Sequence, residues 1–298
     1  MEELSQVKEQ IKFFVKDCGD TRSLELLELL SEGKMLRSKL ILKIAGVSSE
    51  SIKLCAVVEM IQSASLLHDD VIDEADTRRG KPSINALFDN KTSIMFGDIL
   101  YSKAFTELTR MDKDVAYEIA NSVTKLSIGE LHDVEMANEF NTSYDKYFNM
   151  IYNKTASLIE ASAKSAAIIA NKDKESFALY GKNLGLAFQM IDDILDITQD
   201  SRTLGKPAML DFVEGKVTIP YLLLHERMDD KSKLESMYKK ELNEDEQKWI
   251  KDEMIKHNVL MDSISQAQKL GLEAIEAIKE DSNEDLKNIM GQMINREF

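Results

Sequence analysis

Apolar residues recur at intervals of three and four positions over much of the chain. The pattern is most regular over residues 48–74, 92–110, 143–170 and 174–199. This spacing puts the apolar side chains on one face of a helix, and each segment is long enough to form a wall of a helical bundle. The pattern therefore predicts an all-α fold.

Turn-forming residues interrupt the helical pattern at only a few places. The clearest breaks are Cys18–Asp20, Ser31–Gly33, the polar stretch Asp76–Pro82, and the loop around Gly205–Pro207 that continues through Gly215. With 3 prolines and 12 glycines, the chain has little material for hairpin turns. No low-complexity tract, solenoid repeat or Ser/Gly/Pro-rich linker divides the sequence, so one helical domain over residues 1–298 is expected.

Composition narrows the class of protein further. The 298 residues are 43% apolar, which is enough to bury a sizeable core. Cys18 and Cys55 have no partners at the spacing of a disulfide framework or a zinc site. The N-terminus is amphipathic and acidic, and no segment reaches the roughly 18 uninterrupted apolar residues of a membrane span. These features predict a cytoplasmic protein without a membrane span.

The formal net charge of −15 excludes several kinds of partner. A chain this acidic repels nucleic acid and anionic lipid surfaces, so no nucleic-acid partner is expected. Any anionic ligand must instead be captured by a local basic cluster or by metal ions.

Two segments of the chain share the pattern D-D-x-x-D. The first contains Asp69, Asp70 and Asp73, and the second contains Asp192, Asp193 and Asp196. On a helix, the first and last aspartates of each segment project from one face. Apolar neighbours place both clusters partly in the core, where several like charges on one turn require a counter-ion. Carboxylate ligands suit Mg²⁺, which keeps some waters and takes substrate phosphates as further ligands.

A third pair of aspartates shows what a surface pair looks like in this acidic chain. Asp229 and Asp230 are followed by Lys231 and Lys233, and no third carboxylate stands four positions after the first. We assign this pair to the solvated surface. The other two clusters differ because each repeats the full pattern within apolar sequence.

Basic residues bracket the two aspartate clusters. Lys34 and Arg37 lie near the N-terminus, Arg78 and Arg79 follow the first cluster, Lys154 stands between the clusters, and Lys206 and Lys216 follow the second. Arginine can bind a phosphate group through two hydrogen bonds, whereas lysine supplies a mobile point charge. Each residue alone is a weak signal. Together, in an acidic chain, they indicate a diphosphate ligand.

These motifs resemble those of the trans-isoprenyl diphosphate synthases over residues 33–225. The family pattern G-K-x-x-R is matched at Gly33, Lys34 and Arg37, and the first aspartate motif is followed by the family's R-R-G at Arg78–Gly80. Further matches are the K-T pair at Lys154 and Thr155, Q-x-x-D-D-x-x-D from Gln189 to Asp196, G-K-P at Gly205–Pro207, and D-x-x-E-G-K from Asp211 to Lys216. Two positions depart from the family pattern. Ser38 stands where family members often have proline, and Gln62 stands where many long-chain members have histidine.

The resemblance implies an isoprenoid-synthase-type bundle with a central apolar cavity, a homodimer, and a role for each matched residue. Isopentenyl diphosphate would be held by Lys34, Arg37, Gln62 and Arg79. An allylic diphosphate such as farnesyl diphosphate would be held by Arg78, Lys154, Thr155, Gln189, Lys206 and Lys216. The six aspartates would bind three Mg²⁺ ions and act in catalysis together with Lys154 and Lys206.

The implied reaction is ionisation of the allylic diphosphate, condensation with isopentenyl diphosphate and loss of a proton. The growing chain would pass the helical turn before Asp69, where Ala64 and Ser65 face the same way. In short-chain relatives a bulky side chain at one of these positions blocks the pocket. Two small residues therefore favour a medium- to long-chain product, roughly hexaprenyl to octaprenyl, although small residues are also common where helices cross closely.

Other classes of helical protein fit parts of the pattern. A short-chain farnesyl or geranylgeranyl diphosphate synthase is the nearest alternative. A class I terpene cyclase usually has an N-S/T-E type second motif, in place of the second D-D-x-x-D found here. A di-iron protein expects E-x-x-H on two helices, whereas Glu253 and His257 are one position too far apart. A regulatory subunit of a heteromeric synthase tends to lose one aspartate cluster, and both are intact.

Overall fold

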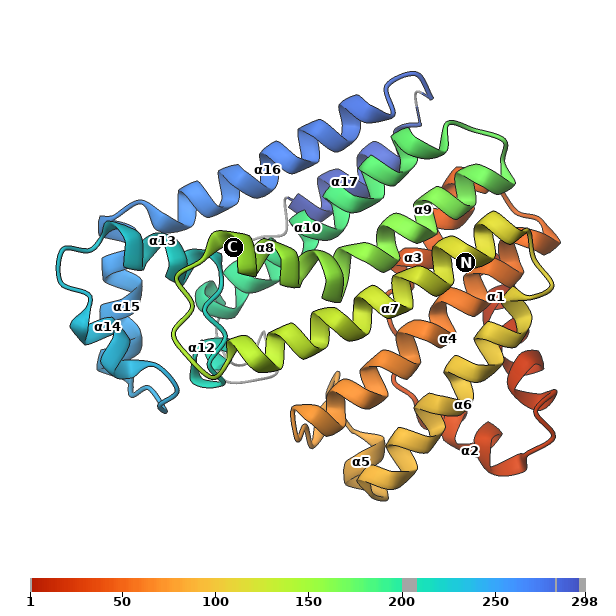
Figure 1. Cartoon of the computed structure of the whole chain (residues 1–298), viewed down its shortest axis with the longest axis horizontal. Coiled ribbons are helices and arrows are strands. Elements are labelled where there is room, and N and C mark those ends of the chain that lie inside the picture. Colours follow the sequence, from red (N-terminus) through yellow and green to blue (C-terminus); the bar gives the residue numbers. More distant parts are fainter. Residues whose placement is uncertain (1, 200–207, 282, 295–298) are drawn as a thin grey trace. The chain divides into compact units, whose positions relative to one another are not determined.

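The computed structural model describes residues 2–199, 208–281 and 283–294 (Figure 1). Helices form nearly all of the regular structure in these ranges, so the expected all-α fold is confirmed. Contacts group the residues into two compact units, which we call unit 1 (Met1–Thr124 and Leu158–Ala178) and unit 2 (Lys125–Ser157 and Leu179–Phe298). That the whole chain acts as one domain stays a prediction.

Unit 1 is built around a long central helix, α4. Its elements are α1 (Glu2–Lys16), α2 (Thr21–Leu29), α3 (Leu36–Ala45), α4 (Ser49–Ile72), α5 (Ile84–Leu87) and α6 (Asn90–Leu108), with the first part of α7 (Lys113–Met136) and most of α9 (Ser157–Ile169). Residues 54–58 of α4 are buried in succession, and α4 packs against α1, α3 and α6. Figure 1 shows α4 and α6 side by side. A helix that is apolar all round belongs in the interior of its unit.

Local sequence fixes both ends of α4. The side chain of Ser48 accepts a hydrogen bond from the Ser51 amide, and the Ser48 amide donates one to the Ser51 hydroxyl oxygen, which forms a capping box. The helix ends at Ile72, and Asp73 caps it. The first aspartate cluster therefore occupies the C-terminal end of the long central helix of unit 1.

A short hairpin replaces the simple break expected over residues 76–82. Strands β1 (Thr77–Arg78) and β2 (Lys81–Pro82) pair in antiparallel fashion. Arg79 and Gly80 link them with φ angles of 54° and 73°. Two consecutive residues in the left-handed region fit a tight two-residue hairpin turn, in which glycine at the second position is favourable. The sequence was expected to leave little material for hairpin turns and to break here. The break takes the form of a short hairpin, which the overall number of glycines could not locate.

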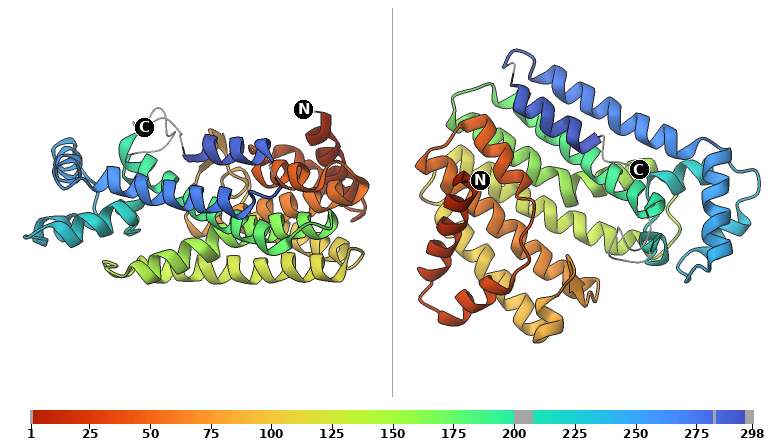
Figure 2. Two further views of the ribbon diagram at one scale, coloured as in Figure 1. Left: turned by 90° about the horizontal axis from the view of Figure 1, so that it is seen from above. Right: turned by 180° about the vertical axis from the view of Figure 1, so that it is seen from behind.

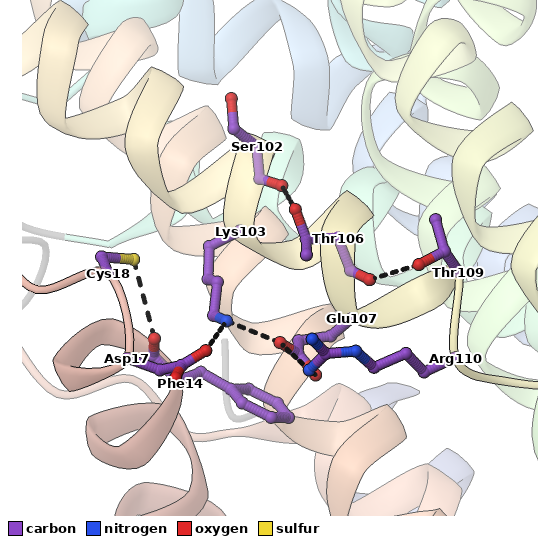
Figure 3. Close-up of polar contacts among 9 residues, drawn as sticks. All are labelled: Phe14, Asp17, Cys18, Ser102, Lys103, Thr106, Glu107, Thr109 and Arg110. Carbon is purple, nitrogen blue, oxygen red and sulfur yellow. Dashed lines mark hydrogen bonds and ion pairs between the residues drawn. The ribbon is translucent and has the colours of Figure 1, made fainter.

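A partly buried group of charges joins the end of α1 to α6 (Figure 3). The Lys103 Nζ lies 2.5 Å from Asp17 Oδ2 and 2.6 Å from Glu107 Oε1, and Arg110 Nη1 donates to Glu107 at 3.1 Å. Only 8% of the Lys103 and Glu107 side chains is exposed. A buried lysine is tolerated here because it faces two carboxylates at once.

Unit 2 contains the rest of the helices. Its elements are the second part of α7, α8 (Tyr144–Ile151), the π-helix η1 (Tyr152–Ala156), most of α10 (Lys174–Thr198), α12 (Leu210–Val213), α13 (Ile219–Arg227), α14 (Ser232–Met237), α15 (Glu244–Lys256), α16 (Val259–Ala277) and α17 (Glu284–Ile294). Helices α16 and α17 pack against each other (Figure 2). Aromatic rings fill part of the core, with Phe212 stacked on Tyr221 at a centroid distance of 4.2 Å.

The segment predicted as one helix over 143–170 has a more complex backbone. It runs through α8, one π-helical turn and α9 without leaving helical geometry. Periodicity over a long window does not detect one extra residue in a turn, because the apolar face recovers within the next turn. This turn carries Lys154 and Thr155.

No helix in residues 2–199, 208–281 and 283–294 has the length and hydropathy needed to cross a membrane.

Candidate active site

The first aspartate cluster is held by the hairpin that follows it. Asp70 is 4% exposed, and Arg78 Nε donates to its Oδ1 at 2.7 Å while the Arg78 guanidinium also forms an ion pair with it. Burial raises the pKa of Asp70 although Arg78 opposes the shift. All three carboxylates lie at the C-terminal end of α4, where the helix dipole is negative. Positive charge is therefore favourable at this place.

The second aspartate cluster has a matching buried member. Asp193 is 3% exposed, and its two oxygens accept hydrogen bonds from Tyr147 Oη at 2.6 Å and Gln189 Nε2 at 2.9 Å. Burial, reinforced by the charge of Asp211, raises the pKa of Asp193 to about 8. Asp196 is also buried and accepts a hydrogen bond from the Asp211 amide at 3.3 Å.

The two clusters share one arrangement, although they lie in different units. In each, the second aspartate is buried and oriented by a neighbouring side chain, whereas Asp69 and Asp192, the first aspartates, are partly exposed. The second aspartate thus fixes the end of its helix. The first is better placed to meet a ligand from solvent.

The donor atoms of both clusters fit Mg²⁺ better than a softer metal. In the described ranges, no three His, Cys, Asp or Glu side chains converge closely enough to hold a metal by themselves. The clusters offer carboxylate oxygens, and Mg²⁺ in proteins is usually bound by one or two carboxylates, with waters and substrate phosphates completing the shell.

Unit 1 also contains the basic residues predicted to hold isopentenyl diphosphate. Among the described residues, Arg37 Nε and Gln62 Oε1 are buried without a hydrogen-bond partner. Burial lowers the pKa of Arg37 to about 10, and Glu59 opposes the shift. Buried polar atoms normally find a partner, so these two atoms are where a polar ligand is expected.

The structure brings the Gly33 loop and the hairpin together. Arg79 Nη1 donates to the Ser31 carbonyl at 3.1 Å, and Ser31 Oγ donates to the Arg78 carbonyl at 3.0 Å. A Cβ atom on Gly33 would lie 2.9 Å from Arg79 Nη1. Glycine at this position therefore lets the Arg79 guanidinium lie against the loop that carries Lys34, which is itself exposed.

Most of the residues predicted for the allylic diphosphate belong to unit 2, whereas Arg78 belongs to unit 1. Lys154 Nζ lies 2.8 Å from Glu130 Oε2 and 2.6 Å from Asp133 Oδ2, and Lys216 Nζ lies 4.0 Å from the same Asp133 oxygen. Thr155 Oγ1 donates to Gln189 Oε1 at 2.8 Å. Gln189 in turn holds Asp193, so the K-T pair and the second aspartate cluster belong to one hydrogen-bonded network. Lys206 lies outside the described residues.

Three residues of this network were missed from sequence. Glu130 and Asp133 hold Lys154, and Tyr147 holds Asp193. Asp133 is only 6% exposed. Its sequence signal is an acidic residue one turn after Gly129 on a helix, but in a chain with 53 acidic residues that signal is lost among surface charges.

The two predicted chain-length positions differ in burial. Ala64 is fully buried in α4, whereas Ser65 is partly exposed and its hydroxyl donates to the Gln62 carbonyl at 3.0 Å. Whether either residue lines the path of the product stays a prediction.

Comparison with known proteins identifies the family. Residues 24–254 match the polyprenyl synthetase model, and the chain belongs to this family. It is 31% identical over 278 residues to an octaprenyl diphosphate synthase of Haemophilus influenzae, covering 91% of this chain and 81% of that protein. A prenyl transferase of Cyanidium caldarium is 41% identical over 207 residues, which are 65% of this chain but only 64% of the relative.

A solved structure extends the likeness to the whole fold. The octaprenyl pyrophosphate synthase of Helicobacter pylori superposes with a TM-score of 0.94 and 42% identity, over 99% of both chains. The resemblance inferred from the motifs is thereby confirmed at the level of family and fold.

The raised pKa of Asp193 predicts how stability changes with pH. The folded protein keeps this proton up to a pKa of about 8, whereas the unfolded chain loses it near a pKa of about 3.9. The unfolded state therefore binds fewer protons between these values, and Asp193 lowers the stability of metal-free protein as pH rises through them. Asparagine cannot ionise. We expect the melting temperature of Asp193→Asn, relative to wild type in a chelating buffer, to increase from about pH 5 to about pH 8.

Asp230→Asn is the matched control for this measurement. A hydrogen bond from Ser232 lowers the pKa of Asp230, so this carboxyl is ionised above about pH 5 in both states. Its melting-temperature difference should stay flat over the same range. A flat difference for Asp193→Asn as well would contradict the assignment of a neutral, buried Asp193.

Proposed function

We propose that the chain is a trans-polyprenyl diphosphate synthase that joins isopentenyl diphosphate to an allylic diphosphate and releases diphosphate. The observation that carries this proposal is the network in unit 2, in which the K-T pair and the second D-D-x-x-D cluster are joined through Gln189. Membership of the polyprenyl synthetase family and the likeness to octaprenyl synthases support it.

Residues of unit 2 would bind the allylic diphosphate. Lys154 and Lys216 supply positive charge, and Thr155 offers a hydroxyl that Gln189 holds in place. Glu130 and Asp133 orient the Lys154 ammonium group before the ligand arrives. Arg78, Gln189 and Lys206 complete the set by family resemblance.

The aspartates would hold Mg²⁺, three ions by family resemblance. When bound, Mg²⁺ neutralises the negative charge that grows on the diphosphate as the allylic C–O bond breaks. Asp70 and Asp193, which Arg78 and Tyr147 hold, keep the ends of their helices in a fixed geometry for the exposed members of each cluster.

Residues of unit 1 would bind isopentenyl diphosphate. The buried, unpartnered Arg37 Nε and Gln62 Oε1 and the nearby loop carrying Lys34 and Arg79 support this side of the proposal. The double bond of isopentenyl diphosphate attacks the allylic carbon that has lost its diphosphate. The resulting cation loses a proton to the released diphosphate, which restores a double bond and completes the step. Apolar helices exclude the water that would otherwise trap the cation.

A direct assay tests the proposed reaction. Wild-type protein incubated with farnesyl diphosphate, isopentenyl diphosphate and Mg²⁺ should release diphosphate and form longer prenyl diphosphates. Asp69→Ala and Asp192→Ala should each lower turnover by about three orders of magnitude or more, while the far-UV circular dichroism stays helical. Each variant loses a carboxylate that would hold Mg²⁺, and the negative charge on the diphosphate is then no longer neutralised.

The surface pair supplies the control, since Asp229→Ala should retain wild-type turnover. If wild-type protein alone releases no diphosphate, the regulatory-subunit alternative replaces the proposal. Near-normal turnover in either cluster variant would remove the aspartates from the mechanism.

We further propose a medium- to long-chain product, roughly hexaprenyl to octaprenyl. Ala64 is small and fully buried on the helix that ends at the first aspartate cluster, and the similar proteins named above include octaprenyl synthases. Ala64→Phe should shorten the product and leave the first condensation within about threefold of wild type, because the substitution adds bulk at this position and replaces none of the charged residues assigned to the diphosphates. Chromatography of products made with excess isopentenyl diphosphate measures this.

Ala64→Ser is the size-matched control and should keep the wild-type product length. The proposal fails if wild-type protein stops at farnesyl or geranylgeranyl diphosphate and Ala64→Phe leaves the product unchanged. That outcome would favour the short-chain alternative.

A homodimer in the cytoplasm is the remaining part of the proposal. Helix α6 exposes Ile94, Met95 and Phe105, and the unit 2 part of α7 exposes Ile128 and Leu131. Apolar helix faces of this kind favour association with a second copy. Light scattering should give twice the 33.8 kDa mass of one chain.

The cytoplasmic location is supported by the two cysteines, which are both free thiols.

A further inference from the structure

The K-T pair lies on an unusual piece of backbone. Lys154 and Thr155 are in the π-helical turn η1, between α8 and α9. A π turn is wider than an α turn and is rarely stable by itself, so surrounding structure must hold it. The contacts of this turn within unit 2 show how it is held.

Helix α7 approaches the turn through a glycine. A Cβ atom on Gly129 would lie 2.6 Å from the Cα of Lys154 and 2.7 Å from the carbonyl carbon of Asn153. Both atoms belong to the backbone, so neither can rotate away. One turn later on α7, Asp133 holds the Lys154 ammonium group at 2.6 Å.

Helix α10 approaches the same turn in the same manner. A Cβ atom on Gly185 would lie 2.5 Å from the Cα and 2.7 Å from the Cβ of Ala156. One turn later on α10, Gln189 accepts the hydrogen bond of Thr155 at 2.8 Å. Positions i and i+4 share a helix face, so on both helices the glycine and the polar partner face the turn together.

Both glycines are in helix interiors, where glycine is less favourable than alanine. Close backbone approach is a physical reason to keep them, because no other residue fits. An ordinary contact of a Cβ begins at 3.4 Å, and the Lys154 Cα would lie at 2.6 Å with the Lys154 amide nitrogen closer still. Alanine at position 129 would therefore separate the Lys154 backbone from α7 by about 0.8 Å or more. That displacement is enough to break a hydrogen bond made by a neighbouring side chain.

We propose that Gly129 and Gly185 are positioning residues that clamp the π-helical turn, so that Lys154 and Thr155 are presented to a diphosphate group. This inference rests on the proposed function, in which these two side chains bind the allylic diphosphate. The glycines touch no substrate. They set the distance between the turn and the two helices whose polar residues orient its side chains.

Gly129→Ala and Gly185→Ala test the clamp, and Gly291→Ala is the matched control. Gly291 also lies within a helix of unit 2, but a Cβ there would meet nothing within 4 Å. Calorimetric titration with inorganic diphosphate and Mg²⁺ should show binding weakened about tenfold or more in the two clamp variants and unchanged in the control.

Steady-state kinetics of the two clamp variants should show that kcat falls by no more than about a hundredfold and that the KM for the allylic substrate rises. The KM for isopentenyl diphosphate should stay within about threefold of wild type.

The combination of Gly185→Ala with Ala156→Gly keeps the test decisive if Gly185→Ala alone does not fold. It removes the 2.7 Å contact and leaves the one with the Ala156 Cα. Partial recovery of diphosphate binding supports the clamp, and a folded double variant without recovery overturns it. The clamp is also overturned if wild type binds diphosphate and both glycine variants bind it as the control does. Absence of binding by wild type would instead count against the proposed function itself.

Discussion

The structure depends on placing clustered carboxylates at the ends of apolar helices without letting their charge unfold those helices. Each unit meets this constraint by burying the second aspartate of its motif and giving it a fixed partner. In unit 1 the partner is the Arg78 guanidinium, and in unit 2 the partners are Tyr147 and Gln189. The two solutions differ in charge. Arg78 forms an ion pair with Asp70 and opposes the rise of its pKa, whereas the hydrogen-bond donors to Asp193 are neutral and burial raises its pKa to about 8.

The cations of the site are positioned by local backbone geometry. Arg79 and Gly80 adopt left-handed angles in the hairpin turn, which lets the Arg79 guanidinium reach the Ser31 carbonyl. Lys154 is presented by a widened helical turn that approaches α7 and α10 through glycines. In both places a side chain that we propose binds a diphosphate is carried by backbone that is unfavourable unless its surroundings hold it. Such costs are typical of functional sites, where geometry matters more than local stability.

Family membership agrees with the chemistry inferred from the residues. The polyprenyl synthetase match covers residues 24–254, which include every motif from Gly33 to Lys216.

The two positions that depart from the family pattern, Ser38 and Gln62, remain compatible with the proposed site. The Ser38 hydroxyl donates to Glu59 at 2.7 Å, and Glu59 lies in the electrostatic surroundings of Arg37. Gln62 keeps a buried polar atom where the family often has histidine.

The sequence by itself determined the helical class and the long helices, and it marked the two aspartate clusters and the basic residues around them as candidates for the site. Apolar spacing and repeated motifs are local properties, so a single chain carries them in readable form. Only the tertiary structure decided that Asp70 and Asp193 are buried anchors, that Glu130 and Asp133 hold Lys154, and that two glycines allow a π turn between them. These features depend on which helices approach each other and how closely. That distance is set by packing between segments far apart in the chain, and no local pattern records it.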